Sequence, residues 1–143
     1  MFKSIINQVG GTTCIYGASG SGKTRMLMQM EQQLQPHLRL RVSVETLHDD
    51  YISKLRACSS EPLHAYQGVK YLLLDNLWLL ISRPIMASIV CGLIRQRTAA
   101  GRTTIVTSDL SLKQWQDVNP ELAEVLNSFV PFWLQRKQSV VNT

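Results

Sequence analysis

The feature that most constrains this chain is the segment GASGSGKT at positions 17–24, which fits the pattern Gly-x-x-x-x-Gly-Lys-Ser/Thr. The residues before it, TTCIY at 12–16, favour a β-strand, and residues 23–34 carry apolar side chains at helical spacing. A strand, a glycine-rich loop and a helix in this order predict a loop that turns its backbone N–H groups around phosphates. The positive end of the helix would point at the same phosphates.

The phosphates expected in this loop belong to a Mg-bound nucleotide, ATP or ADP. Lys23 would reach the β- and γ-phosphates, and Thr24 would offer its hydroxyl to Mg²⁺. A Gly/Ser-rich turn without a ligand is the alternative, but such a turn does not require both a strand before it and a helix after it. The predicted nucleotide-binding residues here are Gly17, Ala18, Ser19, Gly20, Ser21, Gly22, Lys23, Thr24 and Arg25.

A second polar signal follows the apolar run YLLL at 71–74, which suits a central parallel strand buried on both faces. Asp75 ends this run and is the natural carboxylate to hold Mg²⁺ through water, opposite Thr24. An isolated Asp at such a place is more often a turn or cap residue, but the upstream loop favours the metal site. The next residue is Asn76, whose amide cannot take a proton at neutral pH, so we expect slow hydrolysis.

A third polar signal is Thr107-Ser108-Asp109, at the end of a β-branched strand predicted at 103–107. A polar side chain there could sense the γ-phosphate or orient the attacking water. We therefore add Ser108 to the nucleotide-binding residues and Asp109 to the catalytic set, which also contains Lys23 and Asp75. Asp109 could equally cap the short helix that follows, and both interpretations stay open.

Strands and helices alternate along the whole chain. Further strands are expected at 38–44, near a sheet edge, and at 130–134. One helix is expected at 46–58 with Thr46 as its cap, and another at 83–99 with Ser82 as its cap and Gly101 as its terminator. Two more helices are expected, one from 112 and one at 120–126. This order predicts one α/β domain over 1–143: a three-layer αβα P-loop NTPase with a five-stranded parallel sheet and a tail at 136–143 that can fray. Ligands of such sheets bind beyond the carboxyl ends of the strands.

Composition adds few constraints. The net charge of +5 permits contact with DNA, but no recognition helix is evident. Cys14, Cys58 and Cys91 are expected to be core thiols without a metal. The longest apolar stretch is too short to cross a bilayer and no secretory signal is recognised, so we expect a cytoplasmic protein without a membrane partner. The basic residues are scattered, which suits a solvated surface equally well; among them are Arg39, Arg41, Lys54, Arg56, Arg95, Arg97 and Arg102.

The chain resembles the DnaA-type AAA+ proteins, which comprise bacterial replication initiators, Hda-like regulators and DnaC-like helicase loaders. The likeness runs from CIYGASGSGKTRML through VSVETLHDDYISKL, YLLLDNLWLL and AGRTTIVTSDLSLKQW to PELAEVLNSF. The resemblance implies that Asp75 is the Walker B acid and that Asp109, with Ser108, forms the sensor 1 turn. It also implies ATP or ADP with Mg²⁺ as cofactors. The implied partners are replication proteins (an initiator, a helicase or a clamp) or further copies of the chain.

Two departures from this family limit the expected activity. The pair Asp75 and Asn76 is closer to the Hda-like regulators than to the initiators, which usually carry two acids. Where the family places an arginine finger, this chain reads Leu126-Asn127-Ser128-Phe129. We also expect an αβα core without the family's helical lid and its sensor 2 arginine.

The expected function is therefore ATP binding in the initiation of DNA replication or its regulation, through protein partners. Hydrolysis is expected to be weak or to depend on a partner. Two alternatives remain: an interaction module that nucleotide stabilises without turnover, and a small P-loop phosphotransferase.

Overall fold

The structure is a computed structural model that describes residues 12–134. Within this range five parallel strands form one sheet in the order β2-β3-β4-β1-β5. The strands are β1 (Thr13–Tyr16), β2 (Arg39–Ser43), β3 (Tyr71–Asp75), β4 (Thr103–Ser108) and β5 (Val130–Trp133). The predicted five-stranded parallel sheet is confirmed, and β2 lies at an edge, as its alternating pattern indicated.

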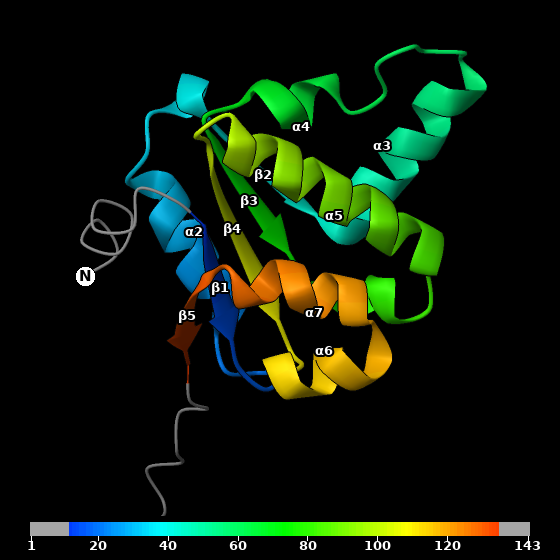
Figure 1. Cartoon of the computed structure of the whole chain (residues 1–143). Coiled ribbons are helices and arrows are strands. Elements are labelled where there is room, and N and C mark those ends of the chain that lie inside the picture. The colour runs from blue at the N-terminus through cyan, green and yellow to red at the C-terminus, as the bar shows by residue number, and fades with distance from the viewer. Residues whose placement is uncertain (1–11, 135–143) are drawn as a thin grey trace, which may run out of the picture.

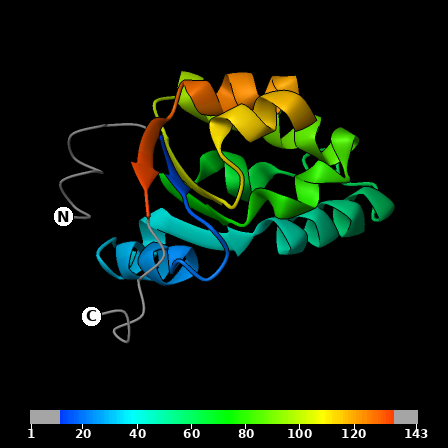
Figure 2. The same cartoon turned by 90° about the horizontal axis from the view of Figure 1, so that it is seen from below.

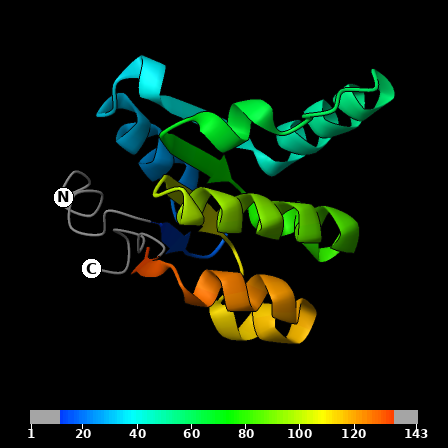
Figure 3. The same ribbon diagram turned by 45° about the horizontal axis from the view of Figure 1, so that its top comes forward.

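Helices cover both faces of the sheet and complete the αβα layers (Figures 1 and 2). Helix α2 lies on one face and α5, α6 and α7 lie on the other. Helices α5 and α7 run side by side (Figure 3). No described helix has both the length and the apolar character needed to cross a membrane. The helical segments are α2 (Lys23–Gln32), η1 (Pro36–Leu38), α3 (Val44–Arg56), α4 (His64–Gly68), η2 (Leu77–Ile81), α5 (Pro84–Ala99), α6 (Leu112–Val118) and α7 (Pro120–Asn127).

Alternate strand residues pack on opposite faces of the sheet. The cluster on the α2 face joins three strands to one side of that helix: Ile15, Leu73, Ile105, Met26, Leu27 and Met30. The neighbouring strand residues Cys14, Leu74 and Val106 belong to the larger core on the other face. Burial of one Leu or Met side chain contributes about 1.5–3 kcal/mol. The smaller cluster therefore holds α2, and the loop before it, against the sheet.

Two helices begin at residues other than the expected caps. The predicted cap of α3 was Thr46, but Ser43 occupies the N-cap position and its hydroxyl accepts from the Thr46 N–H at 3.1 Å. The predicted cap of α5 was Ser82, but Arg83 holds that position without a side-chain hydrogen bond, and Pro84 begins the helix. Ser82 instead closes η2, a segment that was not expected. Gly101 follows α5 with a φ of 74°, which confirms it as the terminator.

The cysteines correct one expectation. Cys14 and Cys91 are buried, but Cys58 is exposed and lies just beyond α3 with a φ of 59°. Residues 55–61 around Cys58 are all exposed, and most of its neighbours, such as Arg56, Ser59 and Ser60, are polar, so this cysteine lies outside the core. The short helix α4 was also missed, because five residues carry too little periodicity to be recognised.

Arg97 corrects the expectation that the basic residues are solvated, because its side chain is fully buried. It lies at the amino end of the sheet, between α5 and the starts of β3 and β4. Its Nε donates to Thr104 Oγ1 at 2.9 Å. Its two terminal nitrogens donate to four backbone carbonyls, those of Tyr66, Val69, Lys70 and Thr103. Five hydrogen bonds match the five N–H donors of a guanidinium, so every donor is paired. The side chain thus links α5 to the amino ends of β3 and β4.

Candidate phosphate-binding site

The loop between β1 and α2 depends on two glycines for different reasons. Gly22 has a φ of 95°, a left-handed conformation that favours glycine, and it is the N-cap of α2. Gly17 follows β1 and has no space for a side chain: a Cβ there would lie 2.6 Å from the Leu134 carbonyl oxygen and 2.5 Å from Ser21 Oγ. The first turn of α2 contains no acidic residue, and its N–H groups have no partner within the helix. The N–H groups of this first turn can therefore donate to an anion bound at the loop.

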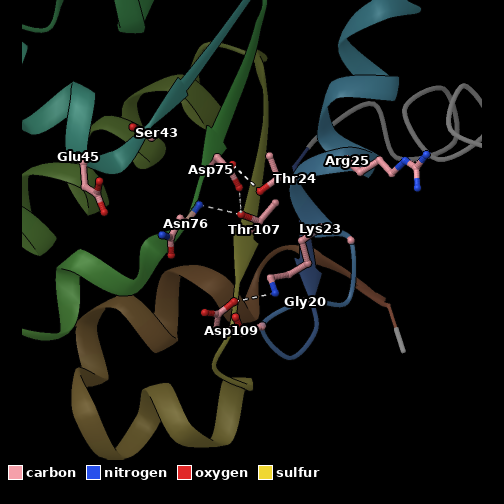
Figure 4. A pocket seen from close by; sticks show the side chains of 12 residues that line it. Gly20, Lys23, Thr24, Arg25, Ser43, Glu45, Asp75, Asn76, Thr107 and Asp109 are labelled. Carbon is pink, nitrogen blue, oxygen red and sulfur yellow. Dashed lines mark hydrogen bonds and ion pairs between the residues drawn. The ribbon is translucent and has the colours of Figure 1, made fainter. Parts of the chain in front are cut away.

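Lys23 is the first residue of α2, and its side chain is 8% exposed. Its Nζ donates to the carbonyl oxygens of Gly17 at 2.6 Å and Ala18 at 2.8 Å. It also lies 2.7 Å from Asp109 Oδ1 (Figure 4). The two carbonyls belong to the loop itself, so the ammonium lies over the loop where a phosphate would bind. Phosphate oxygens are charged acceptors and make stronger hydrogen bonds with an ammonium than neutral carbonyls do.

Asp75 connects the phosphate loop to the centre of the sheet. Thr24 Oγ1 donates to Asp75 Oδ2 at 2.8 Å, although the two residues are 51 positions apart. Thr107 Oγ1 donates to Asp75 Oδ1 at 2.5 Å, so each carboxylate oxygen has a hydroxyl partner. The structure thus brings the two predicted Mg²⁺ residues, Thr24 and Asp75, together. A hydroxyl and a carboxylate are oxygen ligands of the kind that Mg²⁺ takes directly or through water.

Asn76 is used in a turn. Its φ is 67°, a conformation that Asn tolerates better than most side chains, and its Oδ1 accepts from the Trp78 N–H at 3.2 Å. Its backbone N–H donates to Thr107 Oγ1 at 2.7 Å. Thr107 therefore accepts from Asn76 and donates to Asp75, which fixes the end of β3 against β4.

Ser108 and Asp109 follow Thr107 but have different partners. Asp109 lines the pocket and pairs with Lys23, whereas α6 is capped by Ser111, whose hydroxyl accepts from the Gln114 N–H at 3.2 Å. The capping role that was open for Asp109 is thus filled by Ser111. The Ser108 hydroxyl is not brought to the pocket: it accepts from Trp115 Nε1 at 2.8 Å in the opposite layer.

Thr107 is the site residue that we had not assigned a role, although strand alternation could have found it. Residues of β4 alternate between the two faces, and Ile105 lies on the α2 face. Thr107, two residues later, shares that face with Thr24, whereas Ser108 points to the face that α6 covers. To predict this role for Thr107 from the sequence, one would need to know which face of the sheet α2 covers.

The pocket extends beyond the predicted residues to the end of β2. Ser43 is the register partner of Asp75, and Glu45 lies two residues further along, in the first turn of α3. Arg25 also lines the pocket, but Figure 4 shows its guanidinium directed away from Lys23 and Asp109. The lining residues are Ser19, Gly20, Gly22, Lys23, Thr24, Arg25, Ser43, Glu45, Asp75, Asn76, Thr107 and Asp109.

These donors and acceptors fit a magnesium nucleotide. The loop N–H groups and Lys23 could hold phosphate oxygens, and Thr24 with Asp75 could hold the metal. Among residues 12–134, the pocket included, no group of three or more His, Cys, Asp or Glu side chains is arranged to hold a metal ion. A Mg²⁺ ion in this pocket would therefore depend on Thr24 and Asp75 together with the phosphate oxygens of the nucleotide.

Comparisons with known proteins identify solved structures that have a similar fold. No protein-family model and no curated protein sequence matches the chain. Domain III of the replication initiation protein DnaA from Thermotoga maritima is similar in structure, with a TM-score of 0.83, 19% identity, and coverage of 93% of this chain and 59% of that one. AMPPCP-bound DnaA from Aquifex aeolicus gives a TM-score of 0.81, 19% identity, and coverage of 93% and 44%.

The DnaC helicase loader is similar at a TM-score of 0.73 and 13% identity, with coverage of 95% of this chain and 86% of that one. The chain thus spans 59% or less of the initiator structures, but most of the DnaC chain. At these identities the likeness establishes the fold alone, an αβα core like that of the DnaA and DnaC structures.

Proposed function

We propose that this protein binds Mg-ATP and Mg-ADP through the loop at 17–24 and acts in the initiation of DNA replication or its regulation. The observation that carries the proposal is the contact between Thr24 Oγ1 and Asp75 Oδ2 at 2.8 Å, beside a Lys23 ammonium held over the loop. Lys23 and Thr24 belong to the loop motif and Asp75 to a separate one, and the three groups meet at the carboxyl ends of β1 and β3. Mg²⁺ with a triphosphate uses this combination of groups.

On binding, Lys23 would exchange its carbonyl partners Gly17 and Ala18 for phosphate oxygens. Thr24 and Asp75 would turn from each other to Mg²⁺, which supplies charge neutralisation at the β- and γ-phosphates. Thr107 would keep the Asp75 carboxylate oriented through its 2.5 Å hydrogen bond. Asp109 would lie next to Lys23 and the terminal phosphate, where its charge can distinguish ATP from ADP.

Slow hydrolysis is part of the proposal. Asn76 stands where many P-loop ATPases carry a second acid, and its side-chain oxygen already accepts from Trp78. An amide cannot take the proton of the attacking water. A nucleotide state that persists suits a protein that signals to partners rather than one that consumes ATP rapidly.

The role in replication is supported by the fold, which this chain shares with the replication initiator DnaA and the helicase loader DnaC. We propose that its partners are an initiator, a replicative helicase, a clamp or further copies of itself. Binding of purified candidates to the immobilised protein, with Mg-ATP and with Mg-ADP, tests this part. Affinities that are undetectable in both states would contradict it.

Calorimetric titration with Mg-ATP and Mg-ADP, with and without EDTA, tests the nucleotide site. We expect both to bind with Mg²⁺, and the thermal midpoint to rise, because saturation at a hundredfold excess over Kd adds about 2.7 kcal/mol of stability. D75N should weaken the Mg²⁺-dependent part of binding. The matched control is D117N, an exposed carboxylate on α6 outside the pocket. Equal melting temperatures with and without nucleotide would refute the proposal.

A further inference from the structure

Three carboxylates line the pocket: Glu45, Asp75 and Asp109. Asp75 is held by the hydroxyls of Thr24 and Thr107, and Asp109 is paired with Lys23. The Glu45 carboxylate makes no hydrogen bond or ion pair with any residue in 12–134. Within residues 12–134, Glu45 is therefore the one pocket carboxylate without a hydrogen-bond or ion-pair partner.

The backbone around Glu45 is well anchored. Ser43 pairs with Asp75 in the sheet and caps α3, and Val44 and Leu47 are fully buried on either side of the glutamate. Because β2 neighbours β3, the first turn of α3 lies just beyond the carboxyl end of β3. Figure 4 shows Glu45 on the side of Asn76 that is away from Thr24 and Lys23. In this view Asn76 lies between Thr24 and the Glu45 carboxylate, which has no partner among residues 12–134.

We propose that Glu45 is the general base of the slow ATP hydrolysis, in place of the acid that Asn76 does not supply. The inference rests on the proposed function, since it requires a triphosphate on the loop. The Glu45 carboxylate accepts a proton from a water whose oxygen bonds to the γ-phosphorus, while the bond from that phosphorus to the β–γ bridging oxygen breaks. ADP leaves with the bond's electron pair, and the proton then passes from Glu45 to the phosphate product.

The simpler interpretation is that Glu45 only stabilises α3, because an acid in the first turn of a helix interacts favourably with the helix dipole. The chain contains a matched comparison for this effect. Glu121 is also the second residue of its helix, α7, and follows Pro120, but it does not line the pocket. Glu121 differs in accepting a hydrogen bond from Ser88 Oγ at 3.0 Å. A purely helical role for both glutamates predicts that neither substitution lowers ATP turnover.

The experiment compares E45Q and E121Q with the full-length wild-type chain. Three quantities are measured: the affinity for Mg-ADP, the affinity for Mg-ADP with aluminium fluoride, and the rate of single-turnover ATP hydrolysis. For E45Q we expect Mg-ADP affinity within about twofold of wild type and turnover lower by about 100-fold, the size of a typical general-base contribution. The affinity for the aluminium fluoride complex, which imitates the transition state, should fall about 10-fold or more.

A second variant tests whether an acid on the other side can replace Glu45. E45Q/N76D should recover part of the turnover, because Asp tolerates the left-handed backbone at position 76 and supplies a carboxylate to the same water. The inference about Glu45 is overturned if wild type binds Mg-ATP but hydrolyses none, or if E45Q matches wild type in turnover and in affinity for the aluminium fluoride complex. A wild type that binds neither nucleotide would instead refute the proposed function.

Discussion

Lys23 and Arg97 are both buried cations, at opposite ends of one sheet, but their partners differ. Lys23, 8% exposed, lies at the carboxyl end and contacts two loop carbonyls and the carboxylate of Asp109. Arg97, fully buried at the amino end, is surrounded by four backbone carbonyls and one hydroxyl. Burial lowers the pKa of Arg97 to about 10, so the guanidinium remains charged at neutral pH.

The partners of a buried cation indicate whether its role is structural or ligand binding. Every donor of Arg97 has a neutral acceptor that belongs to the fold, so no ligand could replace those partners without opening the sheet. Two of the partners of Lys23 belong to a loop, and the third is a side chain 29% exposed. Such partners can be exchanged for phosphate without loss of the core. Arg97 therefore has a structural role, and the exchangeable partners of Lys23 support the binding role that we propose for it.

The largest expected effect is on stability, at Arg97. R97A leaves four carbonyls and the Thr104 hydroxyl without their donors, so we expect the free energy of unfolding to fall by about 3–5 kcal/mol. R97K should lie between this variant and wild type, because an ammonium has three donors where the guanidinium has five. Urea denaturation measures both. The control is R95A, on the exposed side of α5, which should have the same free energy of unfolding as wild type. An equally small effect of R97A would contradict the structural role of Arg97.

The next effect is on binding, at Lys23. K23A should weaken Mg-ATP binding by about 100-fold, or about 2.7 kcal/mol, because it removes charge-assisted hydrogen bonds to phosphate. Its free energy of unfolding without nucleotide should change by less than about 1 kcal/mol, since the pair with Asp109 is partly exposed. Calorimetry and urea denaturation give the two values. K113A, an exposed lysine on α6, is the control. A loss of stability as large as that of R97A would make Lys23 structural too.

A smaller effect is expected at Thr107. T107V keeps the shape of the side chain but removes the donor to Asp75 and the acceptor for the Asn76 N–H. We expect Mg-ATP affinity to fall about tenfold, or about 1.4 kcal/mol, since Asp75 loses its orientation. T103V, at the other end of β4, should bind Mg-ATP like wild type. Unchanged affinity in T107V would show that the hydrogen bond from Thr107 is not needed to orient Asp75.

The smallest effect is expected at Asp109. D109N removes the carboxylate that competes with phosphate for Lys23, so Mg-ADP affinity should rise a few-fold. The free energy of unfolding should stay within about 0.5 kcal/mol, as for other partly exposed ion pairs. Calorimetry measures the Mg-ADP affinity of D109N, with D117N as the control. The result tests whether phosphate replaces Asp109 as the partner of Lys23. Weaker Mg-ADP binding would indicate that Asp109 positions Lys23 for the nucleotide instead of competing with it.

The parts that could be predicted were those with local signals. The loop at 17–24 is contiguous, and its glycines and lysine stand at required spacings. Asp75 was found because an apolar run ends at it. The sequence did not show which face of the sheet each side chain takes. Thr107, which had no assigned role, bonds to Asp75, whereas its neighbour Ser108, which we predicted to bind nucleotide, bonds to Trp115 on the other face.

Arg97 illustrates the same limit. It shares the apolar side of α5 with Val90, Leu93 and Ile94, so its helical position could have indicated burial, although we expected a solvated side chain. The pattern could not supply the set of acceptors, because the carbonyls that bind Arg97 belong to α4, to the residues just before β3 and to the first residue of β4. A buried cation is acceptable only where such partners converge.

The amino-acid sequence by itself determined the order of strands and helices and the phosphate loop, because apolar periodicity, glycines and turns act over a few neighbouring residues. It also predicted Asp75 as the second half of the site. Only the tertiary structure decided which side chains face each other: Thr107 with Asp75, and Asp109 with Lys23. It also placed Glu45 in the same pocket, without a partner in the described range 12–134. The physical reason is that hydrogen bonds and ion pairs depend on distances of a few ångströms between segments far apart in the chain.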